Sequence, residues 1–163
     1  MPPKHPTPPE PQRRLPILLR RAWYGLNQAF RRRISHTRCT PDQYTVLRNL
    51  HELHPTGLSQ AQLTRAMSSD ANTIASLVRR MENQKLLVRS TDPNDRRARR
   101  LQLTEKGQSK FEELRRIALQ LQEDMLQHLP AKNRDAFLQQ LETLALACQK
   151  ASEITSPKDN STE

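Results

Sequence analysis

Apolar residues recur at the helical spacing of three and four positions along much of the chain. The first run starts at Ile17 and is interleaved with arginines; its apolar members are Leu18, Leu19, Ala22, Trp23, Leu26, Phe30 and Ile34. This pattern predicts a long amphipathic helix. The segment Thr40-Pro41-Asp42-Gln43 then has the form of a capping box, with proline suited to the first helical position, so a second helix is expected from about Pro41 to Leu53.

A short helix, a tight turn and a longer helix follow. Pro55-Thr56-Gly57 interrupts the pattern, Ser59 can cap the short helix, and Met67-Ser68-Ser69 makes the next break. The longer helix begins near Asp70, and its apolar face consists of Ile74, Leu77, Val78 and Met81. The opposite face consists of Asn72, Thr73, Ser76, Arg79 and Arg80. This arrangement predicts a helix-turn-helix.

Two short strands and two further helices complete the pattern. The strands, at 86–91 and 99–103, flank the turn sequence Asp92-Pro93-Asn94-Asp95 and predict a hairpin of the winged type. Thr104 can cap a helix that runs to about Gln127. After Leu129-Pro130, a last helix carries an apolar stripe, on which we expect Cys148 to be core; the stripe consists of Phe137, Leu138, Leu141, Leu144 and Cys148. The fold class is therefore mainly α with a small β-hairpin wing (α+β).

Composition narrows the choice of partner. The chain has 163 residues, enough for one core, and a net charge of +10, which attracts polyanions, nucleic acid before an anionic membrane. The apolar runs are far shorter than the roughly 18 residues that span a bilayer, and the first residues lack the apolar stretch of a signal peptide, so we expect a cytoplasmic protein without membrane attachment. Prolines crowd residues 1–16 and predict a disordered arm, and the polar residues 152–163 predict a flexible tail.

The exposed face of the longer helix is the main candidate for DNA contact. Asn72 can pair with adenine, Ser69, Thr73 and Ser76 can reach base edges or phosphates, and Arg79 and Arg80 can reach guanine or the backbone. A solvated polar face is the alternative. In the hairpin, arginines surround the turn and can enter a minor groove, or form a solvated charge run; they are Arg96, Arg97, Arg99 and Arg100.

Three further groups of residues are weaker candidates for a functional site: a ligand pocket, a redox-active thiol, and a metal or catalytic site. Trp23, Phe30 and Tyr44 can line an apolar ligand pocket, although plain core is the alternative. Cys39 lies beside Arg38 before a helix N-terminus, which favours a redox-active thiolate, and a structural thiol is the alternative. The histidine and cysteine spacings offer too few donors for a metal, and we find neither a phosphate loop nor a nucleophile motif, so no metal, cofactor or enzymatic activity is expected.

Several of these segments together resemble the multiple-antibiotic-resistance regulator (MarR) family. They are Thr40–Leu50, Leu58–Leu63, Asn72–Glu82, Asp92–Ala98 and Leu103–Gly107. The resemblance implies a winged helix-turn-helix lobe at 40–104 in a homodimer held by helices at 17–36 and 105–151. It implies that Asp95 braces Arg97 and that Arg97 approaches DNA. Lys85 stands where the family commonly has glycine, so it must adopt a left-handed conformation or leave the helix by another route.

The family resemblance also implies a function. We expect a sequence-specific regulator that binds double-stranded DNA at a pseudo-palindromic operator, represses transcription and is released by a small aromatic or phenolic ligand, or by an oxidant. Two alternatives remain at this point. One is an architectural DNA binder that responds to no ligand, and the other is a winged-helix module for protein interaction. Dependence of binding on sequence and salt separates them.

Overall fold

The computed structural model describes residues 13–91 and 99–154. The described part is mainly helical with one two-stranded sheet, which is the expected fold class. In chain order, the elements are α1 (Leu15–Arg33), η2 (Ser35–Thr37), α2 (Pro41–Arg48), η3 (Asn49–Leu53), α3 (Gln60–Ala66), α4 (Ala71–Asn83), β1 (Leu87–Thr91), β2 (Arg99–Leu103), α5 (Glu105–Leu126), η4 (Ala131–Asn133) and α6 (Arg134–Ile154).

Each terminal helix extends a few residues further toward its chain end than the sequence predicts. The first helix begins at Leu15 rather than Ile17, because Pro16 lies in the first turn, where a missing N–H costs no helical hydrogen bond. The last helix continues to Ile154, past Ser152, whose hydroxyl donates to the Gln149 carbonyl at 2.7 Å. The predicted arm and tail otherwise lie in residues 1–12 and 155–163, outside the described part of the chain.

Capping boxes begin α2 and α3. In α2, the Thr40 hydroxyl accepts from the Gln43 N–H at 3.2 Å, and the Gln43 side chain accepts from the Thr40 N–H at 3.0 Å. Ser59 and Gln62 make the same pair of bonds at 3.2 and 2.9 Å. The helix expected from Pro41 to Leu53 is present, but it changes from α to π geometry at Asn49.

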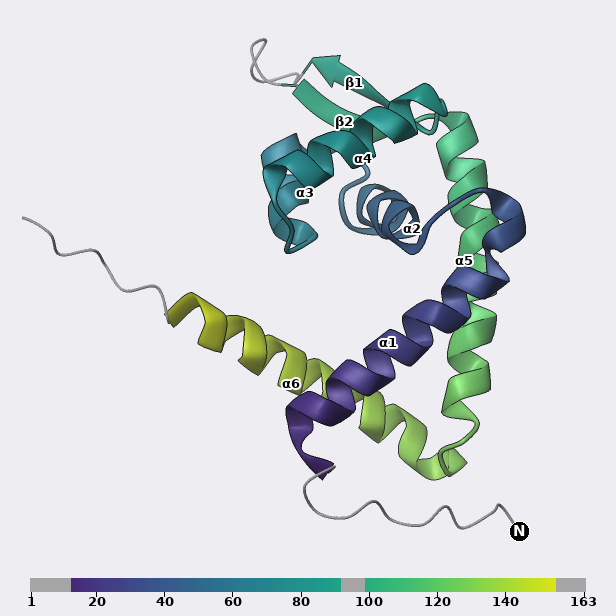
Figure 1. Ribbon diagram of the computed structural model, residues 1–163, viewed down its shortest axis with the longest axis vertical. Coiled ribbons are helices and arrows are strands. Elements are labelled where there is room, and N and C mark those ends of the chain that lie inside the picture. Colours follow the sequence, from purple (N-terminus) through teal and green to yellow (C-terminus); the bar gives the residue numbers. More distant parts are fainter. Residues whose placement is uncertain (1–12, 92–98, 155–163) are drawn as a thin grey trace, which may run out of the picture. The chain divides into compact units, whose positions relative to one another are not determined.

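The chain forms two compact units, one ending at Leu121 and the other beginning at Gln122. In the first unit, α3, α4 and the β1–β2 hairpin lie together at one end (Figure 1). The side chains most fully buried in its core are Ile34, Val46, Leu47, Leu63, Ile74, Val78, Met81, Leu87, Leu101, Phe111 and Leu114. The apolar face predicted for α4 is thus confirmed, and this core holds α4 with its polar face outward.

The second unit contains the end of α5, η4 and α6. Arg134 joins its helices, since its guanidinium donates to the Leu129 carbonyl at 3.3 Å and to Glu123 at 3.2 Å. The prediction that Cys148 is core is wrong for the single chain: Cys148 is exposed, and Phe137 of the same stripe is 43% exposed. The second unit contains only the end of α5 and η4 beside α6, and these elements are too small to cover the whole apolar stripe of α6. Within the described residues, no helix has the length and apolar content needed to cross a membrane.

Candidate nucleic-acid interface

The hairpin is joined to the segment just before α3 by an isolated β-bridge between Leu58 and Leu101. β1 and β2 are antiparallel, with Leu87 opposite Leu103 and Thr91 opposite Arg99. Leu58 and Leu101 exchange backbone hydrogen bonds of 3.2 and 2.7 Å. Gly57, at a φ of 95°, lies so near β2 that an added Cβ would be 2.7 Å from the Leu101 carbonyl oxygen. The helix-turn-helix and the hairpin are therefore parts of one packed lobe.

Asp70 caps the N-terminus of α4. Its carboxylate accepts from the Thr73 N–H at 2.9 Å and from the Thr73 hydroxyl at 2.6 Å. These hydrogen bonds, the side-chain bond first, hold the pKa of Asp70 below its ordinary value of 3.8. The sequence assigned the Thr73 hydroxyl to DNA, whereas the structure uses its proton in the cap. Asp70 adds a negative charge at the end of the helix nearest the predicted base contacts, a feature that the sequence analysis did not weigh.

The face of α4 opposite the core carries the predicted DNA-contacting residues. Asn72, Ser76 and Arg79 follow each other at spacings of four and three positions, so they form one exposed stripe. Thr73 and Arg80 are exposed beside this stripe, and Ser69, before the cap, is half-buried. The structure therefore brings the recognition-helix candidates onto one accessible surface of the lobe.

The C-terminus of α4 ends in a left-handed residue. Lys85 has a φ of 59°. Its N–H donates to the Glu82 carbonyl at 2.8 Å, and the Leu86 N–H donates to the Met81 carbonyl at 2.9 Å. Leu86 and Met81 are both buried, which completes a Schellman motif. Lys85 thus takes the first of the two routes expected from the sequence and adopts the glycine-like conformation.

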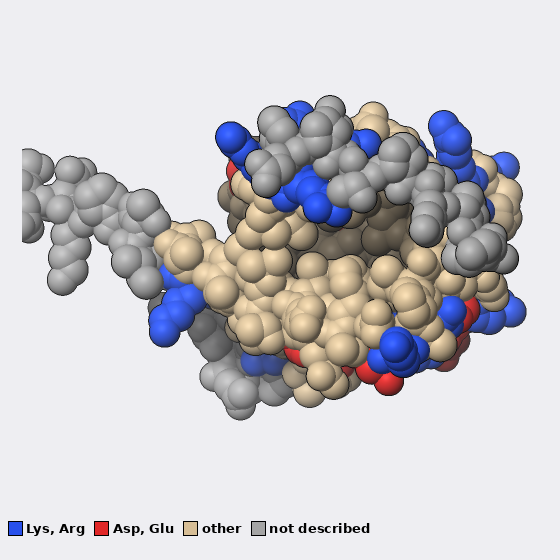
Figure 2. All heavy atoms as spheres, turned by 90° about the horizontal axis from the view of Figure 1, so that it is seen from below, with Lys and Arg blue, Asp and Glu red and all other residues tan. Residues whose placement is uncertain are grey.

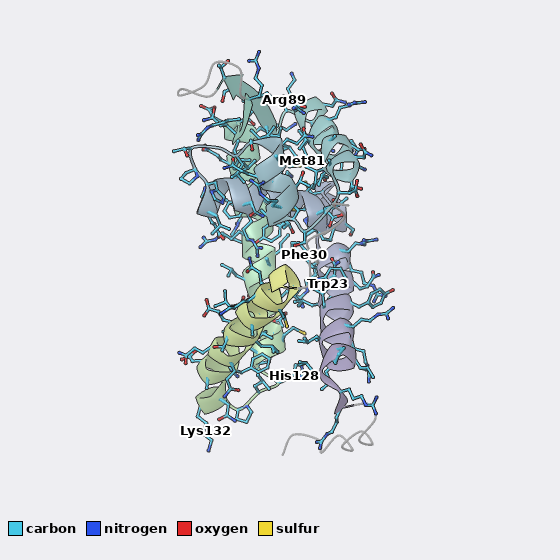
Figure 3. The ribbon with its side chains drawn as sticks, turned by 90° about the vertical axis from the view of Figure 1, so that its left-hand side faces the viewer. Trp23, Phe30, Met81, Arg89, His128 and Lys132 are labelled. Carbon is cyan, nitrogen blue, oxygen red and sulfur yellow. The ribbon has the colours of Figure 1, made fainter. Side chains whose placement is uncertain are left out.

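Side chains from three other elements hold this end of α4. The Gln43 amide of α2 donates to the Gln84 side chain at 2.9 Å. At the start of α5, Lys106 donates to the Gln84 carbonyl at 2.7 Å. From β1, the Arg89 guanidinium donates to Glu82 at 2.9 Å. Figure 3 shows Met81 within this lobe and Arg89 toward its outer end. The sequence analysis missed these contacts, because each joins residues that periodicity does not relate.

Part of the predicted wing interface lies outside the described residues. These are Asp95, Arg96 and Arg97. Arg99 is described and exposed, and its Nη1 donates to the Thr91 hydroxyl across the hairpin at 2.9 Å. Arg100 is half-buried. The two described arginines therefore both lie at the start of β2, and the hydrogen bond to Thr91 of β1 orients Arg99.

The predicted aromatic pocket residues do not form one group. Phe30 and Tyr44 contact each other with ring centroids 5.0 Å apart, and Tyr44 stacks on Phe111 at 6.1 Å; we call these three rings the aromatic cluster. Burial raises the pKa of Tyr44. Trp23 projects from the same helix as Phe30 but is 66% exposed (Figure 3). The prediction that Trp23 joins the other two is wrong for the single chain.

An open hollow lies elsewhere in the first unit, with a volume of about 500 Å³. It is lined by the end of α1, η2 and α5, and we call it the α1–α5 hollow. Its lining residues are Arg33, His36, Glu113, Arg116, Ile117 and Gln120. Trp23, Phe30 and Tyr44 are not among them. The lining has two arginines against the one carboxylate of Glu113, which Lys110 pairs with at 2.6 Å, so it is cationic and suits a small anion. No sequence motif distinguishes these residues from other exposed helical positions.

Cys39 is half-buried beside the core. Burial is the main influence on its thiol and raises its pKa, which opposes the thiolate that the sequence context favours. Its backbone N–H donates to the Thr37 hydroxyl at 3.3 Å. The geometry therefore supports the structural alternative for this thiol. Among the described residues, we find no group of three His, Cys, Asp or Glu side chains arranged to hold a metal ion.

Comparison with known proteins gives consistent matches. The sequence profile of the MarR family matches residues 39–98. The HTH-type transcriptional repressor NicR of Pseudomonas putida is 32% identical over 121 residues, which cover 74% of this chain and 75% of NicR.

Solved structures match over most of the chain. BpsR of Bordetella bronchiseptica, described with the regulation of its DNA binding by 6-hydroxynicotinic acid, is 27% identical with a TM-score of 0.72, and the match covers 85% of this chain and 98% of BpsR. The transcriptional repressor CouR, bound to a 23-mer DNA duplex, is 28% identical with a TM-score of 0.73, and the match covers 83% and 95% of the two chains.

Proposed function

The chain belongs to the MarR family of DNA-binding transcriptional regulators, and on this premise we propose that it is a repressor that leaves its operator when a small aromatic acid binds. The family is one of regulators rather than enzymes. The operator is a pseudo-palindrome, and the site of action is the cytoplasm. The observation that carries the proposal is the exposed stripe of α4, which a buried apolar face and two caps hold in a fixed orientation.

The N-terminal part of α4 is proposed to read bases. In helix-turn-helix proteins, residues near the start of the recognition helix contact base edges in the major groove. Asn72 is exposed there and can bond to both edge atoms of adenine, while Ser76 lies one turn further along. Arg79 and Arg80 follow as contacts for guanine or phosphate. In the wing, Arg97 is proposed to enter the minor groove.

Selection from a random duplex pool tests this assignment. Asn72→Ala should change the selected motif, because it removes a bidentate contact with a base. Asn83→Ala is the matched control: it lies about 20° away around the helix axis but about 16 Å further along. If wild type and Asn72→Ala select the same motif, Asn72 does not read a base. If wild type selects no motif at all, the proposed function is wrong.

Exposed apolar side chains support a homodimer. The helix α1 exposes Trp23 at 66%, and α6 exposes Leu146 at 61%. Figure 2 shows side chains other than Lys, Arg, Asp and Glu over much of the visible surface, with charged side chains of both signs toward its edges. Surfaces of this kind are typical of an interface between subunits. A dimer would place two recognition helices about 34–36 Å apart, which matches successive major grooves.

The α1–α5 hollow is proposed to receive the regulating ligand. Its volume of about 500 Å³ lies within the range of small-molecule sites. Arg33 and Arg116 suit a carboxylate, and Ile117 offers an apolar wall for a ring. The regulation of BpsR by 6-hydroxynicotinic acid supports an aromatic acid as the chemical class. Binding releases DNA only if the ligand prefers the conformation that does not fit the operator.

A panel of aromatic carboxylic acids, added to the complex of wild type with its selected duplex, tests the ligand site. An effective acid should lose potency by about tenfold with Arg116→Ala, since a charge-assisted bond is lost. Arg115→Ala is the matched control, because its neighbouring guanidinium pairs with Glu52 at 3.4 Å and does not line the hollow. Equal potency on wild type and Arg116→Ala would exclude this hollow as the ligand site.

A further inference from the structure

Gln43 makes two structural connections at once. Gln43 is buried, with only 4% of the residue exposed. The amide oxygen accepts from the Thr40 N–H at 3.0 Å and closes the cap of α2, while the amide nitrogen donates to the Gln84 side chain at 2.9 Å. One amide therefore holds the first turn of α2 against Gln84, the residue that follows the last turn of α4.

The same end of α4 also receives hydrogen bonds from residues at the start of α5. Lys106 donates to the Gln84 carbonyl at 2.7 Å, and the Thr104 hydroxyl donates to the Lys85 carbonyl at 2.7 Å. These bonds satisfy carbonyls that a helix C-terminus leaves free. The end of α4 is thus gripped from α2 and from α5, whereas its base-reading end is held by its own cap and the core.

Gln43 is also adjacent to the aromatic cluster. The next residue, Tyr44, contacts Phe30 of α1 and Phe111 of α5. The first turn of α2 therefore contacts α1, α5 and the end of α4. A change in the packing of α1 against α5 would reach the recognition helix through this turn.

From this geometry we propose that Gln43 and Gln84 form a positioning pair that sets the direction of α4, and with it the half-site spacing that the dimer accepts. The proposal rests on the proposed function. Asn72 lies about 18 Å along the helix from Gln84, so a 10° pivot at Gln84 moves it by about 3 Å. That displacement is close to the 3.4 Å step between stacked base pairs. A single hydrogen bond at the pivot can therefore affect register on DNA.

Three variants isolate the bond. Gln84→Ala removes the acceptor at an exposed position and leaves the capping box of α2 intact. Gln84→Glu keeps an acceptor for the Gln43 amide. Gln43→Glu combined with Gln84→Glu keeps the capping box, which accepts glutamate as well as glutamine, but leaves no donor between the two side chains. Asn83→Ala is the control for a change at the adjacent exposed position.

The readout is the ratio of affinities for the selected operator and for operators with one base pair added to or removed from the spacer. This ratio is insensitive to the charge that Gln84→Glu adds, since that charge weakens binding to every operator alike. Thermal unfolding of each variant accompanies the binding measurements. We expect wild type, Asn83→Ala and Gln84→Glu to keep the ratio. Gln84→Ala and the double variant should lower it about fivefold while remaining folded at the temperature of the binding assay, although their melting temperatures fall, because the first leaves the buried Gln43 amide without an acceptor and the second places two carboxylates side by side.

Other outcomes overturn the proposal. If Gln84→Ala keeps the wild-type ratio, the bond does not set spacing. If Gln84→Ala and Gln84→Glu lower the affinity ratio by the same factor, loss of the hydrogen bond does not cause the change in spacing preference. If Gln84→Ala unfolds, the residue is structural. Each of these results leaves the proposed function standing as long as wild type selects a motif, whereas a wild type without a motif removes both.

Discussion

Gly107→Ala should destabilise the lobe, because no room exists for a side chain there. Gly107 is buried in the first turn of α5, and an added Cβ would overlap deeply with the Leu86 carbonyl oxygen and lie 3.0 Å from its carbon. That carbonyl also accepts from the Thr104 N–H at 3.2 Å. Because the close atoms belong to the Leu86 backbone, they cannot rotate out of the way as the end of a flexible side chain would. The start of α5 must therefore move away from the end of α4.

The expected cost follows from three contributions. Overpacking of this kind costs about 1–3 kcal/mol. Loss of the bond between Thr104 and Leu86 costs about 1 kcal/mol. The better helix propensity of alanine offsets up to about 1 kcal/mol. Gly107→Ala should therefore lower the free energy of unfolding by about 2 kcal/mol.

Urea denaturation followed by far-UV circular dichroism measures this difference. Gly25→Ala is the matched control, since an added Cβ there has nothing within 4 Å in the chain, and alanine should stabilise α1 by up to about 1 kcal/mol. The reasoning is refuted if Gly107→Ala unfolds at the same urea concentration as wild type, or if the two variants shift the midpoint in the same direction.

Two further predictions concern the ends of α4. Lys85→Gly should stabilise the protein by about 1 kcal/mol, because glycine adopts the φ of 59° without the strain of a side chain; a lower urea midpoint would contradict this. Asp70→Asn tests the cap through pH. Since the pKa of Asp70 is lowered on folding, its carboxylate stabilises the fold above the ordinary value of 3.8, and this contribution is lost as pH falls through the lowered pKa. Wild type should be more stable than Asp70→Asn at pH 7, with the difference shrinking in acid; a difference independent of pH would show that the charge is not responsible.

Features that depend on local hydrogen bonds and helical periodicity could be predicted from the sequence. The capping box at Thr40 and Gln43, the start of α4 near Asp70 and the buried face of α4 each depend on residues within a few positions of one another. The left-handed conformation of Lys85 was one of two options that followed from the family resemblance, because the family commonly has glycine at this position. These features place on the surface the polar stripe of α4, which holds most of the described residues proposed to contact DNA.

Features that depend on tertiary contacts could not be predicted. Gln43 and Gln84 are 41 positions apart, and neither belongs to a motif that would relate them. The exposure of Trp23 and Cys148 also escaped the sequence analysis, because an apolar stripe shows that a helix needs a partner without showing where the partner comes from. The same limit applied to the α1–α5 hollow, whose lining comes from three elements.

The central claim is sequence-specific recognition of DNA by a dimer through α4. The most direct test is a titration of the wild-type protein, by fluorescence anisotropy at physiological salt, on a promoter duplex carrying the selected motif and on a scrambled duplex of the same composition. The account predicts two chains per duplex and a preference of about a thousandfold or more for the motif. Equal affinity for the two duplexes, lost together as salt is raised, would contradict it.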